Sequence, residues 1–207
     1  MEFRPPITLA GRRIRLVPLS SADVPGLVRA AADPEVGRYL PYTIPPNEDG
    51  MRRLIERLLE QQRTGSDLAF TITEAATSEA VGMTRFLDID RPNERVEIGG
   101  TWLARPLWRG PANTEAKLLL LRHAFEVEGA HRVQLKTDLR NERSQRAIER
   151  LGATREGILR EHMVLPDGYR RSSVVYSIVA SEWPYVRRRL EALAGRPWSG
   201  PGLAAPA

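Results

Sequence analysis

The chain has 207 residues, of which 42% are hydrophobic and 28% charged, and this predicts a single folded domain with a sizeable core. It has no cysteine, which excludes disulfide bonds, thiolate metal sites and a cysteine nucleophile. The net charge of +5 is carried almost wholly by arginines scattered among acidic residues, so we expect no nucleic-acid surface. No signal peptide and no apolar stretch long enough to cross a bilayer is found, which favours a cytoplasmic protein.

Hydrophobic periodicity predicts an alternation of strands and helices along the chain. Strands are predicted over residues 13–17, 68–74, 80–87, 95–103, 132–137, 156–165 and 173–179. Helices are predicted from Ser20 or Ser21 to 31, from Asn47 to 59, over 114–128, over 142–151, and from Ser181 to 193. The domain is expected to span 1–194, and the Gly-, Pro-, Ala- and Ser-containing stretch 195–207 is expected to be a flexible tail.

The order of these elements indicates the fold class. Consecutive strands joined by polar turns predict antiparallel hairpins, whereas the unit in which helix 114–128 links two strands predicts one parallel pair. We therefore expect a mixed α/β (α+β) fold, with a mostly antiparallel sheet of six to seven strands and helices on both of its faces.

Residues 108–116 join a predicted strand to a long predicted helix. Such a junction exposes backbone N–H groups at the positive end of a helix dipole, and this favours a pyrophosphate site. Gly110 and Ala112 would allow a ligand to approach closely. The alternative is that Pro111 and Glu115 simply start a stable helix.

A second segment, residues 141–152, has the pattern of a capped helix. Asn141 suits the N-cap position, Ile148 and Leu151 belong to an apolar face, and Gly152 ends the helix. By itself this pattern indicates a structural element.

Together, the two segments resemble the GNAT superfamily of acetyltransferases, most closely its ribosomal-protein N-terminal acetyltransferase (RimJ/RimL-like) members. The resemblance rests on Trp108 and the Thr-Glu-Ala of residues 114–116, followed by Asn-x-x-Ser, Ala-Ile and Leu-Gly-Ala between 141 and 153. It covers residues 8–190 and is most specific from 97 to 183. It implies transfer of an acetyl group from acetyl-CoA to a primary amine by direct attack, with no acyl-enzyme.

The resemblance also implies where acetyl-CoA would bind. The cofactor would lie where strands 95–103 and 132–137 splay apart, with its pyrophosphate on the backbone of the 109–114 segment. A backbone N–H near Leu103 would bind the thioester oxygen, and Asn141 would hold the pantetheine arm. The residues expected to bind the cofactor are Leu103, Arg109, Gly110, Ala112, Asn113, Thr114 and Asn141.

The sequence departs from the family pattern in its phosphate loop. That loop usually has glutamine or arginine, two residues, glycine, any residue, then glycine or alanine. In one register the two small positions fall on Arg109 and Pro111, and in the other Leu107 takes the place of the glutamine or arginine. A charge from Arg109 on a phosphate is the expected compensation.

The second departure concerns the proton donor to the leaving thiolate. Many relatives carry a tyrosine seven residues after the helix asparagine, and Ile148 stands there in this chain. RimL-like relatives have a serine at the position of Ser144, which is therefore our candidate acid. The alternative is that its hydroxyl bonds the backbone of its own helix.

An amine must lose a proton before it attacks, and Glu97 is the candidate general base because it lies on the strand beside the expected thioester. The alternative is that Glu97 is a surface charge. Glu161 and His162, on a later strand, rank lower. The histidines have no metal-ligand spacing, so we expect no metal.

Two acceptor classes stay open, a protein N-terminus or a small amine, and the loop from Tyr39 to Tyr42 is expected to influence that choice. An alternative function is an acetyl-CoA sensor or scaffold without turnover. The protein is expected to be a monomer or a homodimer.

Overall fold

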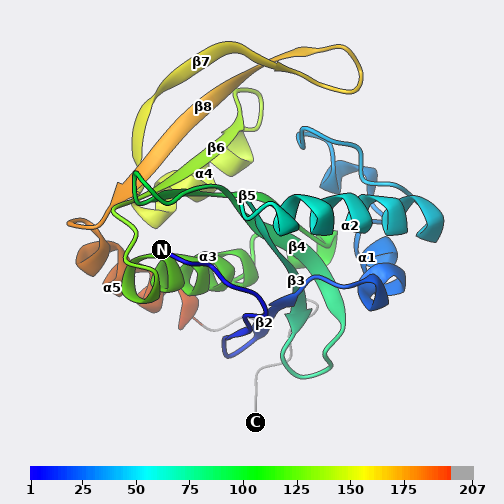
Figure 1. Cartoon of the computed structure of the whole chain (residues 1–207), viewed down its shortest axis with the longest axis horizontal. Helices are drawn as coiled ribbons and strands as arrows, with labels where there is room; N and C mark the ends of the chain where they lie inside the picture. The colour runs from blue at the N-terminus through cyan, green and yellow to red at the C-terminus, as the bar shows by residue number, and fades with distance from the viewer. Residues whose placement is uncertain (197–207) are drawn as a thin grey trace.

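The computed structural model describes residues 1–196, which build one sheet of eight strands (Figure 1). In space the strands follow the order β1-β2-β3-β4-β5-β6-β8-β7, and β5 pairs with β6 in parallel while the other pairs are antiparallel. The strands are β1 (Leu9–Ala10), β2 (Ile14–Pro18), β3 (Leu68–Glu74), β4 (Ala80–Asp90), β5 (Arg95–Leu103), β6 (Arg132–Asp138), β7 (Thr154–Val164) and β8 (Arg170–Val179). The predicted fold class is confirmed. The strand beyond the expected number is β1, which is too short for an alternating pattern to reveal.

Helices cover both faces of this sheet, as predicted. They are α1 (Val24–Ala30), α2 (Glu48–Arg63), α3 (Ala112–Arg122), α4 (Glu142–Leu151) and α5 (Trp183–Ala194). Figure 1 shows α1 and α2 on one side of the sheet and α3 and α5 on the other. The helix predicted over 114–128 begins earlier, at Ala112, and passes into a π-helical turn over His123–Val127. No helix in residues 1–196 is long and apolar enough to cross a membrane.

Most of the helix ends agree with the capping residues predicted from the sequence. The side chains of Asn47 and Asn141 cap α2 and α4, and Gly152 ends α4 with a φ of 103°. The prediction that Ser181 caps the last helix is wrong, because the chain first makes a tight turn after β8 and α5 begins at Trp183. The predicted tail over 195–207 lies, from residue 197 onward, outside the described part of the chain.

Strands β5 and β6 pair only over residues 95–97 and 132–134, and then separate as predicted. Beyond the last residue of β5 that pairs with β6, β5 bulges against β4, and Gly100 in the bulge adopts a φ of +56° that favours glycine. A Cβ on Gly100 would lie 2.7 Å from Arg85 Nε, so the bulge also leaves no room for a side chain. The result is an opening in the middle of the sheet.

The sheet separates two hydrophobic cores. One core joins residues of β2 to β6 and β8 to α3, α4 and α5, and we call this side the α3–α5 face. The other joins Ala69, Met83 and Trp102 to α1 and α2, and we call it the α1–α2 face. Because the second core takes strand residues from β3 to β5 alone, α1 and α2 leave the matching surface of β6 and β8 uncovered by apolar packing.

Strands β7 and β8 form the hairpin predicted around residues 166–168, and they arch away from the sheet as an arm at the top of Figure 1. The register shifts between Leu159 and Met163, so β7 bulges while β8 stays continuous. The arm curves toward the side of the sheet that holds α2, and it bounds the space beside β6.

Candidate active site

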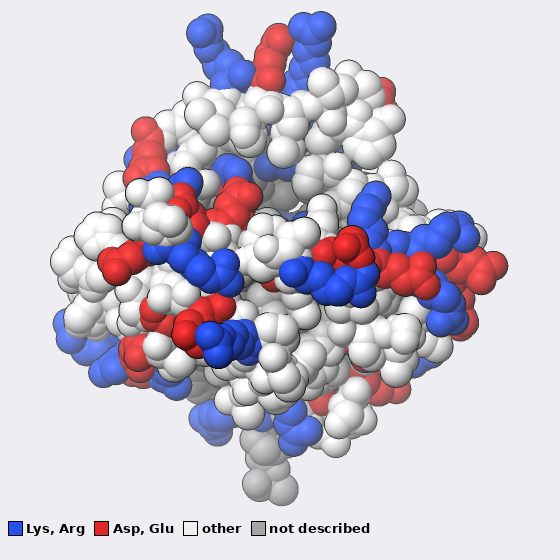
Figure 2. All heavy atoms as spheres, in the orientation of Figure 1, with Lys and Arg blue, Asp and Glu red and all other residues white. Residues whose placement is uncertain are grey.

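A cavity of ≈ 950 Å³ reaches the opening between β5 and β6. Its walls come from the loop before α2, α2 itself, the residue before β3, strands β4 to β6, the start of α3, α4 and the arm. Figure 2 shows the surface hollowed beneath the arm, with acidic and basic side chains interspersed around it. Most predicted site residues line this cavity: Glu97, Leu103, Arg109, Gly110, Asn113, Asn141 and Ser144. Ala112 and Thr114 are buried beside it and do not line it.

The first turn of α3 contains backbone N–H groups that the described part of the protein leaves without an acceptor. Within residues 1–196, no acceptor is found for the N–H groups of Ala112, Asn113 and Thr114. Glu115 is the first to donate, to Pro111 O at 2.9 Å. These groups and the helix dipole favour an anion at this end.

The loop before α3 is partly closed upon itself. Gly110 N–H donates to Leu107 O at 3.2 Å, so in this conformation its donor is engaged within the protein. Arg109 has a φ of 65°, an uncommon conformation for a residue with a side chain. The unusual loop sequence therefore corresponds to an unusual loop geometry.

The Thr-Glu-Ala motif has a structural explanation at Glu115. Its buried carboxylate accepts hydrogen bonds from Arg12 N–H and, at 3.2 Å, from Arg13 N–H. A side chain on Gly11 would collide with the same carboxylate. Glu115 thus ties α3 to the turn between β1 and β2, and it fixes where the helix begins.

Trp108 is hydrogen-bonded to the end of β5. Its Nε1–H donates to Leu103 O at 2.8 Å, and the guanidinium carbons of Arg105 and Arg143 lie 4.2 and 3.3 Å from its ring centroid. Burial and the nearby Arg105 lower the pKa of Arg143. Two cations held close together beside the start of α3 favour binding of an anionic group.

Asn141 caps α4 as the sequence indicated, whereas the hydroxyl of Ser144 is not found bonded to the backbone of its own helix in the described residues. Asn141 Oδ1 accepts the Ser144 N–H at 3.1 Å, which is the helix cap, while no partner for the Asn141 amide nitrogen is found in the described residues. No hydrogen bond of the Ser144 hydroxyl is found there either. Ile148, at the position of the missing tyrosine, lines the cavity and is 5% exposed.

Glu97 lies where β5 and β6 begin to separate. Its neighbours Val96 and Ile98 belong to the α3–α5 core, so by strand alternation its side chain points to the α1–α2 face. The carboxylate accepts a hydrogen bond from Gln134 Nε2 at 3.2 Å and forms a salt bridge with Lys136 Nζ at 2.8 Å. It is 6% exposed, so the surface-charge alternative is wrong.

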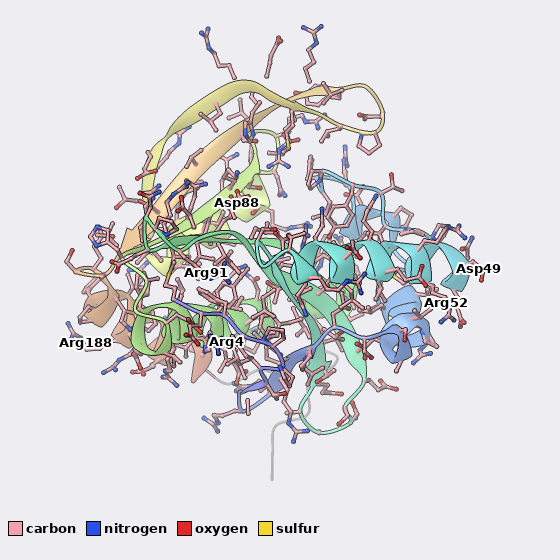
Figure 3. The ribbon with its side chains drawn as sticks, in the orientation of Figure 1. Arg4, Asp49, Arg52, Asp88, Arg91 and Arg188 are labelled. Atoms are coloured by element: carbon pink, nitrogen blue, oxygen red, sulfur yellow. The ribbon has the colours of Figure 1, made fainter. Side chains whose placement is uncertain are left out.

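Lys136 also approaches a second carboxylate. Asp88, labelled in Figure 3, lies on β4 with its Oδ2 3.9 Å from Lys136 Nζ, and both residues line the cavity. The two lower-ranked candidates for the general base differ in position. His162 lines the cavity, and its Nδ1 forms a hydrogen bond with Ser173 Oγ at 3.2 Å. Glu161 is exposed and forms a salt bridge with Arg170 at 3.1 Å. No group of three or more potential metal ligands occurs among residues 1–196.

Sequence reasoning missed Lys117. Its Nζ donates to Thr101 Oγ1 at 2.7 Å, and Thr101 Oγ1 lies 2.7 Å from Thr84 Oγ1. The side chain is 6% exposed and lines the cavity from the α3–α5 face. Burial lowers the pKa of Lys117 to about 7, although Glu97 acts in the opposite direction. A signal existed, because Lys117 is one of two lysines in the chain and interrupts an apolar run.

Sequence reasoning also missed the arginines of the α1–α2 face. Arg85 Nη1 pairs with Asp67 Oδ2 at 3.0 Å, and burial raises the pKa of Asp67 despite this partner. Arg171, on β8, lines the same cavity. Both arginines are nearly buried, and neither belongs to a local pattern that the sequence alone would distinguish from other arginines.

These features define the class of the protein. A helix start with free N–H groups beside two separating strands suits an anionic ligand, and a buried carboxylate at their junction suits proton transfer beside it. Residues 13–154 match the acetyltransferase (GNAT) domain family, and the chain belongs to this family of N-acetyltransferases.

Known proteins share the fold over nearly the whole chain. A crystal structure of a putative acetyltransferase from T. thermophilus is 46% identical, with a TM-score of 0.83, over 91% of this chain and 97% of that one. The uncharacterized N-acetyltransferase p20 of Bacillus licheniformis is 28% identical over 75% of this chain and 86% of its own length. Mycobacterium smegmatis RimJ, solved in complex with CoA-disulfide, has the same fold, with a TM-score of 0.81 at 23% identity over 94% of this chain and 98% of that one.

Proposed function

We infer that this protein transfers the acetyl group of acetyl-CoA to a primary amine, by direct attack of the amine within a ternary complex. The observation that carries this inference is the position of Glu97, buried at the point where β5 and β6 separate and within the same cavity as the start of α3. That position would put a proton acceptor beside the thioester.

The residues present fit a CoA thioester. The unpaired N–H groups of Ala112, Asn113 and Thr114 would bind the pyrophosphate, and Arg109 would add a charge. The Asn141 amide nitrogen would donate to the pantetheine arm, while its oxygen keeps capping α4. The backbone of Leu103, held by Trp108, would orient the thioester oxygen. RimJ, which shares the fold, was solved with a CoA derivative, and this supports the assignment.

The proposed chemistry divides between the two faces of the sheet. Glu97 takes a proton from the incoming amine, whose nitrogen forms a bond to the acetyl carbon as the carbon–sulfur bond breaks. Ser144, on α4, gives a proton to the departing sulfur in place of the absent tyrosine. Its hydroxyl is suited to this role because it lines the cavity and no hydrogen bond of it is found in the described residues.

The first experiment measures acetyl-CoA-dependent thiol release with two pools of acceptors, peptides with free N-termini and small amines. Release of the thiol with either pool supports acetyl transfer. The variant Ser144→Ala should then lower kcat about 100-fold or more while the affinity for acetyl-CoA stays nearly unchanged. An unchanged kcat in Ser144→Ala would show that another group protonates the thiolate. Tight acetyl-CoA binding without transfer to any amine would instead favour a sensor.

A further inference from the structure

Arg171 lies on the α1–α2 face of the sheet, which is the face of Glu97. Val174, Tyr176 and Ile178 of β8 belong to the α3–α5 core, and β8 is continuous, so Arg171 points the other way. The start of α3 lies on the opposite face. Arg171 therefore adjoins the part of the cavity that an acceptor amine would enter, not the part that would hold the cofactor phosphates.

The guanidinium of Arg171 is buried, and no partner for it is found in the part of the chain that the structure describes. The side chain is 5% exposed, and neither a hydrogen bond nor a carboxylate within 4.0 Å is found for it in residues 1–196. Its Nε is fully enclosed and unsatisfied. Burial lowers the pKa of Arg171, although Asp138 and Glu97 raise it. A buried guanidinium in this state is costly unless a ligand or water satisfies it.

The neighbouring charges are already matched. Arg85 pairs with Asp67 at 3.0 Å, and Lys136 pairs with Glu97 at 2.8 Å. Asp138, the last residue of β6, binds Arg140 through both of its oxygens, at 3.1 and 2.8 Å. Within the described residues, Arg171 is therefore the buried cation of this face that has no anionic partner. Arg57 of α2 also lines the cavity without an ion pair among these residues, but it is exposed to solvent.

We propose that the acceptor amine carries a carboxylate, and that Arg171 binds this carboxylate while the amine faces Glu97. The proposal rests on the proposed acetyl transfer and specifies its acceptor. A guanidinium can bind a carboxylate through two parallel hydrogen bonds, which would orient the acceptor as well as attract it. Polyamines fit this face poorly, because its carboxylates are already engaged by Arg85, Lys136 and Arg140.

The test compares acceptors that differ only in the carboxylate. One arm uses glycine and glutamate against glycinamide and the α-carboxamide of glutamate, and the other uses peptides with aspartate or asparagine as the second residue. Because amides and acids differ in amine basicity, the readout is the acid-to-amide ratio of kcat/KM, compared between the wild type and Arg171→Gln. The arm that responds identifies whether the carboxylate belongs to a free amino acid or to a peptide.

The expected result is an acid-to-amide ratio that falls about 10- to 100-fold in Arg171→Gln, since hydrogen bonds to a charged group are lost. Arg171→Lys keeps a cation but loses the paired hydrogen-bond geometry of a guanidinium, so in this variant the acid-to-amide ratio should fall by a smaller factor. The matched control is Arg170→Gln, an exposed neighbour on β8 that does not line the cavity, which should leave the ratio unchanged.

An unchanged ratio in both Arg171 variants would overturn the proposal, even if acetyl transfer itself is efficient. If no amine is acetylated at all, the proposed function fails. The carboxylate site at Arg171 is then tested by measuring ligand binding instead of activity. Calorimetry on the CoA-loaded protein then compares each acid with its amide. Tighter binding of the acid that disappears in Arg171→Gln would support the site, and equal binding would refute it.

Discussion

The two faces of the sheet carry their chemistry in different ways. On the α3–α5 face, the groups that suit a CoA thioester come from two continuous segments, the start of α3 and the start of α4. On the α1–α2 face, the polar groups come one or two at a time from Asp67, which precedes β3, and from β4, β5, β6 and β8. The first arrangement is fixed by local helix geometry, and the second exists only once the sheet has formed.

The largest expected effect tests the acceptor side at Glu97. Glu97→Gln keeps the size of the side chain but removes the proton acceptor, so we expect kcat to fall about 100- to 10,000-fold with little change in acetyl-CoA affinity. Steady-state kinetics and calorimetric titration with acetyl-CoA would measure the two quantities. Glu161→Gln is the matched control, because Glu161 is exposed and outside the cavity, and it should change neither.

A kcat that survives Glu97→Gln would mean that the buried carboxylate only neutralises Lys136. The base would then have to come from elsewhere on the same face, and His162 would be the next candidate because it lines the cavity. Burial and the nearby Lys136 and Arg171 lower the pKa of His162, which favours its neutral, proton-accepting form.

The sequence was sufficient for the fold class and for most of the cofactor side. Asn141, Ser144 and the α3 start are recognisable because caps and helix starts depend on neighbours in sequence. Glu97 could be proposed as the general base because of its place on the predicted strand. Lys117 and Arg171 could not be assigned roles, since their burial depends on strands and helices distant in sequence. The same holds for the lack of a partner for Arg171 among the described residues.

The next largest effect concerns Lys117, which reaches the opening from the α3–α5 face. Its pKa falls from 10.5 in the unfolded chain to about 7 in the folded protein, so the unfolded state binds more protons between those values and wild-type stability rises with pH across that window. Lys117→Met should therefore be more stable than the wild type by a few kcal/mol at pH 6, since no charge need be buried.

This advantage of Lys117→Met should shrink as the pH rises from 7 toward 10.5, where the wild-type lysine is neutral in both states. Urea unfolding of both proteins at a series of pH values measures it. A difference in unfolding free energy that does not vary with pH would contradict the lowered pKa of Lys117. Loss of activity in a stable Lys117→Met would indicate that the site retains this lysine for catalysis or positioning.

The smallest expected effect separates the two roles of Asn141 on the cofactor side. Its oxygen caps α4, and its amide nitrogen is proposed to bind pantetheine. Asn141→Ala removes both groups, so it should weaken acetyl-CoA binding about tenfold and lower stability by about 1 kcal/mol. Asn141→Ser keeps a capping oxygen and should weaken binding alone. Thermal unfolding and calorimetric titration distinguish these outcomes. If Asn141→Ser binds acetyl-CoA like the wild type, Asn141 is a helix cap only, and the cofactor side is held by α3 without help from α4.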